Sequence, residues 1–332
     1  MQKLRVMTYN VRYFSHATRG LASTGRTMDA IALAIARLDP LPDIVCLQEL
    51  ETASVRANLA HPRGAPEDTQ LSRLMLHLHT ALSRVGKADS YAGYYFPAHT
   101  YRLTRRRNIY TTGLAVLAHH DFHVDYHNAG RPADITYRRL QAVADLKQTR
   151  ISAHVRFLHK SGQTIDIFNT HLSLPAFWAR EFWAGSERMG YGRNQLAEGR
   201  KLADFIDRER QSDRYIVVGD FNALPGSPLH RYLTEERGLR DAFHLVSGGN
   251  FAELRKWPTA GFLHLRMHLD HVFTGPGIEW IDFEGSEPYG SRSSPFYGLS
   301  DHVPLIARCR IPDGEAKAAE TRPEAPRGNG GP

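Results

Sequence analysis

Polar residues that could bind a metal ion or move a proton follow several apolar segments of this 332-residue chain. Six such places carry Asp, Asn, Glu or His at or beside the end of an expected strand, where side chains can converge on one rim of a sheet. Carboxylate and amide oxygens are the ligands that a hard cation such as Mg²⁺ requires. The absence of a Cys–His cluster disfavours a structural zinc site. The residues are Asn10, Glu49, His171, Asp220 with Asn222, Asp270, and Asp301 with His302.

The elements that must position these residues alternate between strands and helices. Apolar residues at helical spacing predict helices over 27–38, 69–85 and 194–208. Several strands follow one another without a helix between them, which favours antiparallel hairpins in an α/β protein rather than a Rossmann unit. The chain also lacks a GxGxxG or GxxxxGK[ST] loop. The predicted strands are 4–9, 44–47, 113–117, 140–146, 151–158, 164–169, 215–219, 269–273 and 303–309.

Composition places the chain among ordinary globular proteins, with 42% hydrophobic and 23% charged residues. The segment 312–332 lacks large apolar residues, so we expect a single domain over 1–311 and a disordered tail. No signal peptide and no apolar stretch of about 18 residues is evident, and Cys46 and Cys309 lie in apolar runs. We therefore expect a cytoplasmic protein with reduced thiols. The net charge of +7 suits an anionic partner, although many basic proteins bind no specific anion.

Six motifs carry a family resemblance. The sequences TYNVR, LQELE, NTHLS, GDFNALPGSP, LDHVF and LSDHVPL resemble, in this order, those of the endonuclease/exonuclease/phosphatase superfamily, and they span residues 4 to 310. The resemblance implies the deoxyribonuclease I-like fold, a four-layer α/β/β/α sandwich of two mixed, largely antiparallel sheets. It also implies hydrolysis of phosphoesters with Mg²⁺ or Mn²⁺ as the cofactor.

The resemblance also implies a role for each metal-side residue. Glu49 looks like the principal metal ligand. Asn10 resembles the asparagine that hydrogen-bonds the catalytic acid near the metal. Asp301 resembles a carboxylate close to the metal, acting directly or through water.

The remaining motif residues resemble the catalytic group. Asp220 matches the acid that orients or deprotonates the attacking water, and Asn222 matches the residue that holds the phosphate. His302 matches the histidine that faces the scissile phosphate, with Asp270 as the carboxylate that fixes its tautomer. His171 resembles a phosphate contact or proton donor. The chemistry is coherent, because a cation offsets the charge of the phosphate while a carboxylate positions water and polar donors stabilise the phosphorane.

Two positions qualify the resemblance. Arg12 stands where the abasic endonuclease branch commonly has an acid that resembles a metal ligand, and that branch also lacks the histidine of NTHL. Both departures point away from abasic-site repair. His271 follows Asp270 directly, so strand alternation directs it to the opposite face and predicts a structural role.

Two segments could determine the substrate. The run YRLTRRRNIY at 101–110 places arginines beside tyrosines, which can hold phosphates and stack bases, although a solvated basic loop is an equal alternative. The aromatic-rich insertion 175–194 could be a lid, a stacking platform, a membrane-surface wedge or a helix that packs inward. The substrate-binding candidates are Arg105, Arg106, Arg107, Tyr110, Trp178 and Trp183.

Three functions remain open at this point. The first is a Mg²⁺-dependent nuclease or phosphodiesterase, expected to be a monomer, that cleaves DNA or RNA by in-line attack of water. The second is a sphingomyelinase-like enzyme or another phosphatase acting on a lipid or small phosphorylated molecule, for which peripheral membrane contact is conceivable. The third is a non-catalytic scaffold on the same fold, which the complete set of site residues disfavours.

Overall fold

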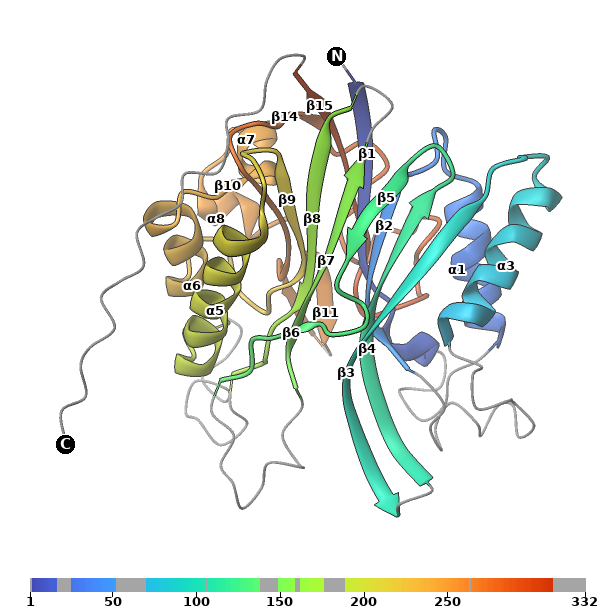
Figure 1. The fold of residues 1–332 in the computed structure, drawn as a ribbon, viewed down its shortest axis with the longest axis horizontal. Helices are drawn as coiled ribbons and strands as arrows, with labels where there is room; N and C mark the ends of the chain where they lie inside the picture. The colour runs from blue at the N-terminus through green and yellow to red at the C-terminus, as the bar shows by residue number, and fades with distance from the viewer. Residues whose placement is uncertain are drawn as a thin grey trace.

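The computed structural model describes residues 2–16, 25–51, 70–104, 107–137, 149–158, 162–175, 189–262 and 264–312. Two large sheets pack face to face, and helices cover both outer faces (Figure 1). This is the predicted four-layer α/β/β/α arrangement. The strand predicted at 140–146 lies outside the described residues, as does residue 313 onward of the predicted tail.

The first sheet has the strand order β14-β15-β1-β2-β4-β3. Only the β1–β2 pair is parallel, so the sheet is mixed and largely antiparallel. The strands are β1 (Gln2–Asn10), β2 (Ile44–Leu50), β3 (Tyr91–Thr104), β4 (Arg107–His119), β14 (Glu279–Asp282) and β15 (Leu305–Ile311).

The second sheet has the order β10-β13-β9-β8-β7-β5, and β6 pairs with β7. Here only β8 and β9 run parallel. The strands are β5 (His123–His127), β6 (Ala133–Asp134), β7 (Ile151–Leu158), β8 (Thr164–His171), β9 (Tyr215–Asp220), β10 (Arg240–Asp241) and β13 (Asp270–Thr274), and a separate hairpin pairs β11 (Ala260–Phe262) with β12 (Leu265–Met267).

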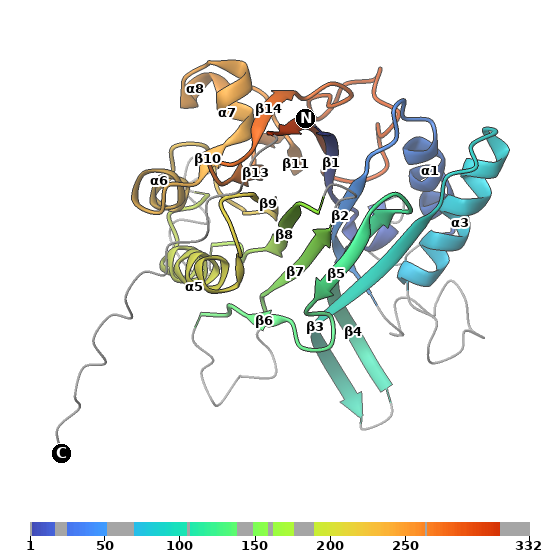
Figure 2. The same ribbon diagram turned by 45° about the horizontal axis from the view of Figure 1, so that its top comes forward.

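Alternation along β1 shows how the layers form. Leu4 and Val6 face the second sheet, whereas Met7 and Tyr9 pack under the helices of the outer layer. Figure 2 shows α1 and α3 on one flank and α5 and α6 on the other. The helices are α1 (Gly25–Ala36), α3 (Gln70–Arg84), α5 (Arg193–Glu209), α6 (Pro228–Arg231), α7 (Ala242–Ser247) and α8 (Phe251–Leu254), with a 3-10 turn at Arg12–Phe14 and a π-helical turn at Tyr232–Glu236.

The predicted elements in the described residues are present, with ends shifted by a few positions, except that β4 is far longer than 113–117. The sequence analysis did not predict β3, nor the shorter elements β5, β6, β10, β11, β12, β14, α6, α7 and α8. β3 and β4 form a hairpin that outgrows its sheet. β2 ends where Leu50 pairs with Gly113, yet β3 and β4 stay paired as far as Thr104 and Arg107. We call residues 99–104 and 107–112 the hairpin arm; Figure 1 shows it projecting beyond the body of the sandwich. Six residues of strand extend roughly 20 Å.

Both cysteines, Cys46 and Cys309, are buried and free, as the sequence predicts. Within the described ranges, no helix is long and apolar enough to cross a membrane.

Candidate active site

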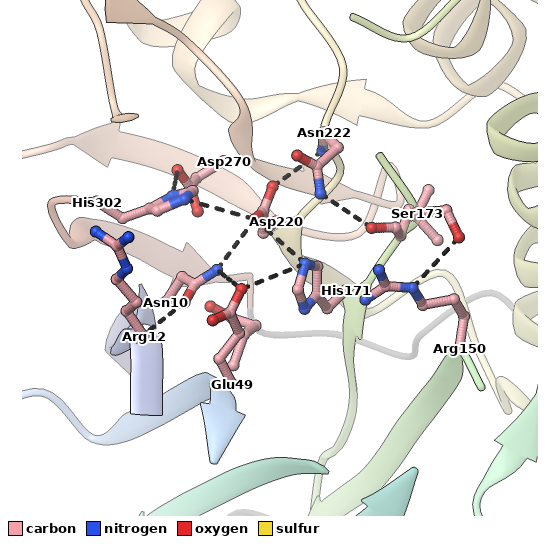
Figure 3. Close-up of polar contacts among 12 residues, drawn as sticks. Asn10, Arg12, Glu49, Arg150, His171, Ser173, Asp220, Asn222, Asp270 and His302 are labelled. Carbon is pink, nitrogen blue, oxygen red and sulfur yellow. Dashed lines mark hydrogen bonds and ion pairs between the residues drawn. The ribbon is translucent and has the colours of Figure 1, made fainter. Parts of the chain in front are cut away.

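Three of the predicted residues meet at the seam between the sheets. The Asn10 side chain, at the end of β1, donates from Nδ2 to Glu49 Oε1 at 3.2 Å and to Asp220 Oδ2 at 3.1 Å (Figure 3). Asn10 and Asp220 are buried. The amide of Asn10 therefore connects a carboxylate of the first sheet to a carboxylate of the second.

Glu49 reaches the seam through an irregular backbone. The β2–β4 register shifts between Gln48 and Leu50, and Glu49 adopts a φ of +58°. A residue with a Cβ pays about 1 kcal/mol or more in this left-handed region, and such strain is maintained where the surrounding structure enforces it. The bulge directs the carboxylate to the rim.

His302 and Asp270 form a hydrogen-bonded pair next to Asp220. His302 Nδ1 lies 2.8 Å from Asp270 Oδ2, and its Nε2 lies 3.7 Å from Asp220 Oδ2. Backbone amides of Leu269 and Asp270 both donate to Thr259 Oγ1, which fixes the start of β13. Burial lowers the pKa of His302, but the carboxylates of Asp270 and Asp220 outweigh burial and raise this pKa well above its ordinary value. His302 is therefore a cationic donor facing the carboxylate cluster.

His171 flanks Asp220 on the other side. Its Nε2 lies 3.5 Å from Asp220 Oδ2 and 3.8 Å from Glu49 Oε1. Burial, followed by the charge of Arg150, lowers the pKa of His171 well below its ordinary value. The cluster thus has one charged and one neutral histidine, which suits different proton-transfer roles.

Asn222 is held against Asp220 by its own backbone. The Asn222 amide N–H donates to Asp220 Oδ1 at 2.9 Å, and its side chain donates to the Leu172 carbonyl at 2.9 Å. Gln195 Nε2 of α5 donates to the Asn222 carbonyl at 2.6 Å. Asn222 also has a positive φ, of +49°. These contacts fix the turn that follows β9 and so fix the direction of the Asp220 carboxylate.

Asp301 has a partner that the sequence did not reveal. Arg12 Nη1 lies 2.9 Å from Asp301 Oδ2, and both side chains are partly exposed. The Arg12 backbone N–H donates to Asn10 Oδ1 at 3.0 Å. An arginine of the chain thus offsets the charge of Asp301 at the edge of the cluster.

His271 lies on the opposite face of β13 from Asp270, as strand alternation predicts. Its Nε2 lies 2.8 Å from the Ala223 carbonyl, and its Nδ1 lies 3.5 Å from Asp241 Oδ2. Asp241 Oδ2 is also 2.8 Å from His230 Nε2, and all three side chains are buried. His271 therefore belongs to a buried network behind the site.

The donor set fits a hard divalent cation. Burial raises the pKa of Asp220 to about 7 and also raises that of Glu49, for which the nearby Asp301 adds to the effect. In addition, Asp270 Oδ1 is buried without a hydrogen-bond partner in the described part of the chain. Buried carboxylates at such close range repel one another, and a cation bound among their oxygens would relieve that repulsion.

Several predicted residues cannot be placed in this site. Arg105, Arg106, Trp178 and Trp183 lie outside the described residues. Arg107 and Tyr110 lie in the hairpin arm, where the structure describes only the backbone.

Conversely, the structure adds Arg150, Ser173 and Glu198 to the site. Arg150 Nε donates to Ser173 Oγ at 3.3 Å, and Ser173 Oγ donates to Glu198 Oε1 at 2.8 Å. No motif marks Arg150 or Glu198, whereas Ser173 ends the NTHLS motif. The one available signal is that Ser173 stands two positions after His171.

Comparisons with known proteins identify the family of the chain. A sequence model of the Endonuclease/Exonuclease/phosphatase family matches residues 7–302. A search of curated proteins found no match.

Solved structures share the fold at low sequence identity. A Beutenbergia cavernae endonuclease/exonuclease/phosphatase has a TM-score of 0.60 and 18% identity, covering 94% of this chain and 72% of that one. The human nocturnin catalytic domain with bound sulfate has a TM-score of 0.55 and 19% identity, covering 93% and 95%. ANGEL2, a 2′,3′-cyclic phosphatase, has a TM-score of 0.56 and 17% identity, covering 92% and 95%.

Proposed function

Because this chain belongs to the endonuclease/exonuclease/phosphatase family of phosphoester hydrolases, we propose that it uses Mg²⁺ to cleave phosphodiester bonds in DNA or RNA. The observation that supports this substrate is the hairpin arm. The arm extends past the strand that carries Glu49, its sequence contains Arg102 and Arg107, and Arg105 and Arg106 stand between its two strands in the sequence. A basic arm beside a catalytic rim suits an extended anionic substrate.

Each residue of the rim then has a task. Bound at Glu49, with Asn10 and Asp301 nearby, the cation would offset the charge of the phosphate and of the departing oxygen. Asp220 accepts a proton from the attacking water and aligns it for in-line attack. Charged His302, oriented by Asp270, donates a hydrogen bond to the phosphate.

His171 and Asn222 complete this proposal on the opposite side of Asp220. His171 and Asn222 both contact the Asp220 carboxylate. A phosphate bound between His171 and His302 would therefore lie within reach of His171 and Asn222. We assign them to contact with the phosphate oxygens.

A small phosphoester remains the alternative substrate, and ANGEL2, described as a cyclic phosphatase, is an example of such activity on this fold. Nicking of supercoiled plasmid and cleavage of single-stranded RNA in Mg²⁺ or Mn²⁺ separate the two. Cleavage that is absent in Asp220→Ala supports the nucleic-acid proposal. Hydrolysis of only soluble phosphate esters or sphingomyelin would contradict it. A monomer in the cytoplasm remains our expectation for the protein.

Removal of the metal is expected to abolish hydrolysis. With excess EDTA the wild type should lose activity, and Mg²⁺ or Mn²⁺ should restore it. Glu49→Gln removes one negative charge from the cluster without changing its size, so we expect at least about tenfold weaker Mg²⁺ binding by calorimetry. Exposed Glu279→Gln is the matched control. Equal Mg²⁺ affinity in Glu49→Gln and wild type would remove Glu49 from the ligand set.

Neutralising the arm should affect polymers selectively. We expect Arg105, Arg106 and Arg107, replaced together by alanine, to raise KM for long DNA or RNA while kcat for bis-p-nitrophenyl phosphate stays the same. If the three contact phosphates, the slope of log affinity against log salt should become smaller by about 3. Arg208→Ala, at an exposed side chain of α5, is a control that removes one positive charge away from the hairpin arm. An unchanged salt slope would show that the arm does not contact the strand.

A further inference from the structure

A pocket beside His171 lies between the base of the hairpin arm and β7. It is a shallow hollow that is open to solvent. Ala98 and 112–114 line it from the first sheet, and 149–151 with His171 line it from the second. The pocket therefore extends from the catalytic cluster toward the arm, on the side of Asp220 away from His302.

Arg150 brings a buried positive charge to this pocket. Arg150 is 8% exposed, and its Nε donates a hydrogen bond to Ser173 Oγ. Across the described ranges, no carboxylate forms an ion pair with Arg150, and its two terminal nitrogens have no acceptor. Burial, followed by the charge of Arg150, lowers the pKa of His171, and the same charge partly offsets the burial that raises the pKa of Glu49; Figure 3 shows Arg150 beside His171. These terminal nitrogens can therefore form charge-assisted hydrogen bonds to an anion that enters the pocket.

The support beneath Arg150 keeps this charge available. Glu198 is fully buried on α5, and it accepts the Ser173 hydroxyl at 2.8 Å and the Ser173 backbone N–H at 2.9 Å. Ser173 thus stands between the carboxylate and the guanidinium. A direct Arg–Glu pair would neutralise the arginine, whereas the interposed hydroxyl fixes Nε and leaves the planar pair of terminal nitrogens for an external anion.

We propose that Arg150 and this pocket bind a second phosphate of the substrate, the one next to the scissile phosphate on the side of the hairpin arm. The inference rests on the proposed nucleic-acid cleavage. The two histidines flank Asp220 and so define the place of the scissile phosphate, while Arg150 lies beyond His171 toward the arm. A nucleic-acid strand that runs from the carboxylate cluster to the hairpin arm would pass the Arg150 guanidinium before it reaches the arm.

The test compares dithymidine phosphodiester with the same dinucleotide carrying one additional terminal phosphate, at the 5′ end or at the 3′ end. In the wild type, one of the two phosphorylated substrates should have a KM about 10- to 100-fold lower, with little change in kcat. Arg150→Ala should abolish this preference, and Arg150→Lys should restore part of it. Arg208→Ala should retain it in full. A preference that persists in Arg150→Ala, or that is absent from the wild type, would overturn the proposal.

Ser173 and Glu198 are positioning residues in this proposal. Ser173→Ala should weaken the preference for the additional phosphate, which the ratio of the KM values for the dinucleotide with and without that phosphate measures. Thermal melting of each variant identifies any that fail to fold, and Arg150→Lys keeps the test valid if Arg150→Ala is unstable.

A second measurement separates this inference from the proposed function. If the wild type cleaves no dinucleotide, the nucleic-acid proposal fails, and calorimetry with inorganic phosphate in EDTA then tests the subsite alone. Binding to wild type that is lost in Arg150→Ala and kept in Arg208→Ala supports an anion site. Equal binding to all three proteins, or to none, contradicts it.

Discussion

Asp220→Asn is expected to lower kcat for phosphodiester hydrolysis by about 10²- to 10⁴-fold, the range that a positioned general base contributes. The change removes the proton acceptor and one negative charge. It keeps the size of the side chain and an oxygen that can accept from the Asn222 N–H. We therefore expect the loss to arise in the chemical step rather than in folding.

The measurement is kcat on an oligonucleotide and on bis-p-nitrophenyl phosphate, with circular dichroism to confirm the fold. Asp125→Asn, an exposed residue of β5, is the matched control. Retention of wild-type kcat on both substrates by Asp220→Asn would remove Asp220 from the mechanism and with it the centre of the proposed site.

Asp241→Asn is expected to reduce the free energy of unfolding by about 3 kcal/mol, since it leaves buried hydrogen-bonding groups of the network without a partner. Asp241 Oδ1 accepts from the backbone N–H of Phe243 and of His244, at the start of α7. Its Oδ2 is shared by His230 and His271. Asparagine offers one acceptor oxygen, so these contacts cannot all be retained.

Urea unfolding of wild type, Asp241→Asn and the control Asp125→Asn gives this difference directly. A midpoint for Asp241→Asn within error of the wild type would mean that the network contributes little to stability. The kcat of folded Asp241→Asn should stay close to that of the wild type, because the network lies behind the site and contacts no proposed ligand.

The buried histidines of this region predict acid sensitivity, and they include His268, whose ring lies 5.1 Å from that of His271. Burial lowers the pKa of His268 to about 4 and also lowers that of His230, so between pH 6.5 and about 4 the unfolded chain binds protons that the folded chain does not. Stability should therefore fall as pH falls through this window, by up to about 1.4 kcal/mol per pH unit for each histidine. Burial opposes ionisation of Asp241, but hydrogen bonds from His230 and His271 outweigh it and hold its pKa well below its ordinary value. Its contribution thus persists above about pH 3.8 and is lost only at lower pH.

Melting temperatures from pH 7 to pH 4 test this dependence, and His268→Gln should flatten it. A melting temperature that does not change between pH 7 and pH 5 would contradict the assignment of these histidines as neutral in the folded state.

The helices and the strand ends could be predicted because each depends on local sequence, whereas the four-layer arrangement was expected from the family resemblance. Apolar spacing identified α1, α3 and α5, and short apolar runs ending in Asn10, His171 and Asp220 placed those residues at strand ends that the structure brings together. Parallel pairing of β1 with β2, and of β8 with β9, makes these ends share one edge. The spacing of apolar residues is a local property, so it indicates where helices lie and where strands end.

The remaining features depend on contacts between distant segments. The bulge that directs Glu49 is a register shift between β2 and β4, which no spacing of residues reveals. The Arg12–Asp301 pair joins positions at the two ends of the chain, and Arg150 acquires its place through Ser173. β3 was not predicted, and its residues alternate poorly between apolar and polar types.

The bridge that Asn10 makes between Glu49 and Asp220 has a consequence for how the protein could be divided. Neither sheet alone contains a complete active site, because one sheet carries Asn10 and Glu49 while the other carries Asp220. A chain cut between β6 and β7 would give two fragments, each catalytically silent. Hydrolysis would return only when the two fragments associated, so the rate of hydrolysis would measure how much of the fragment complex had formed.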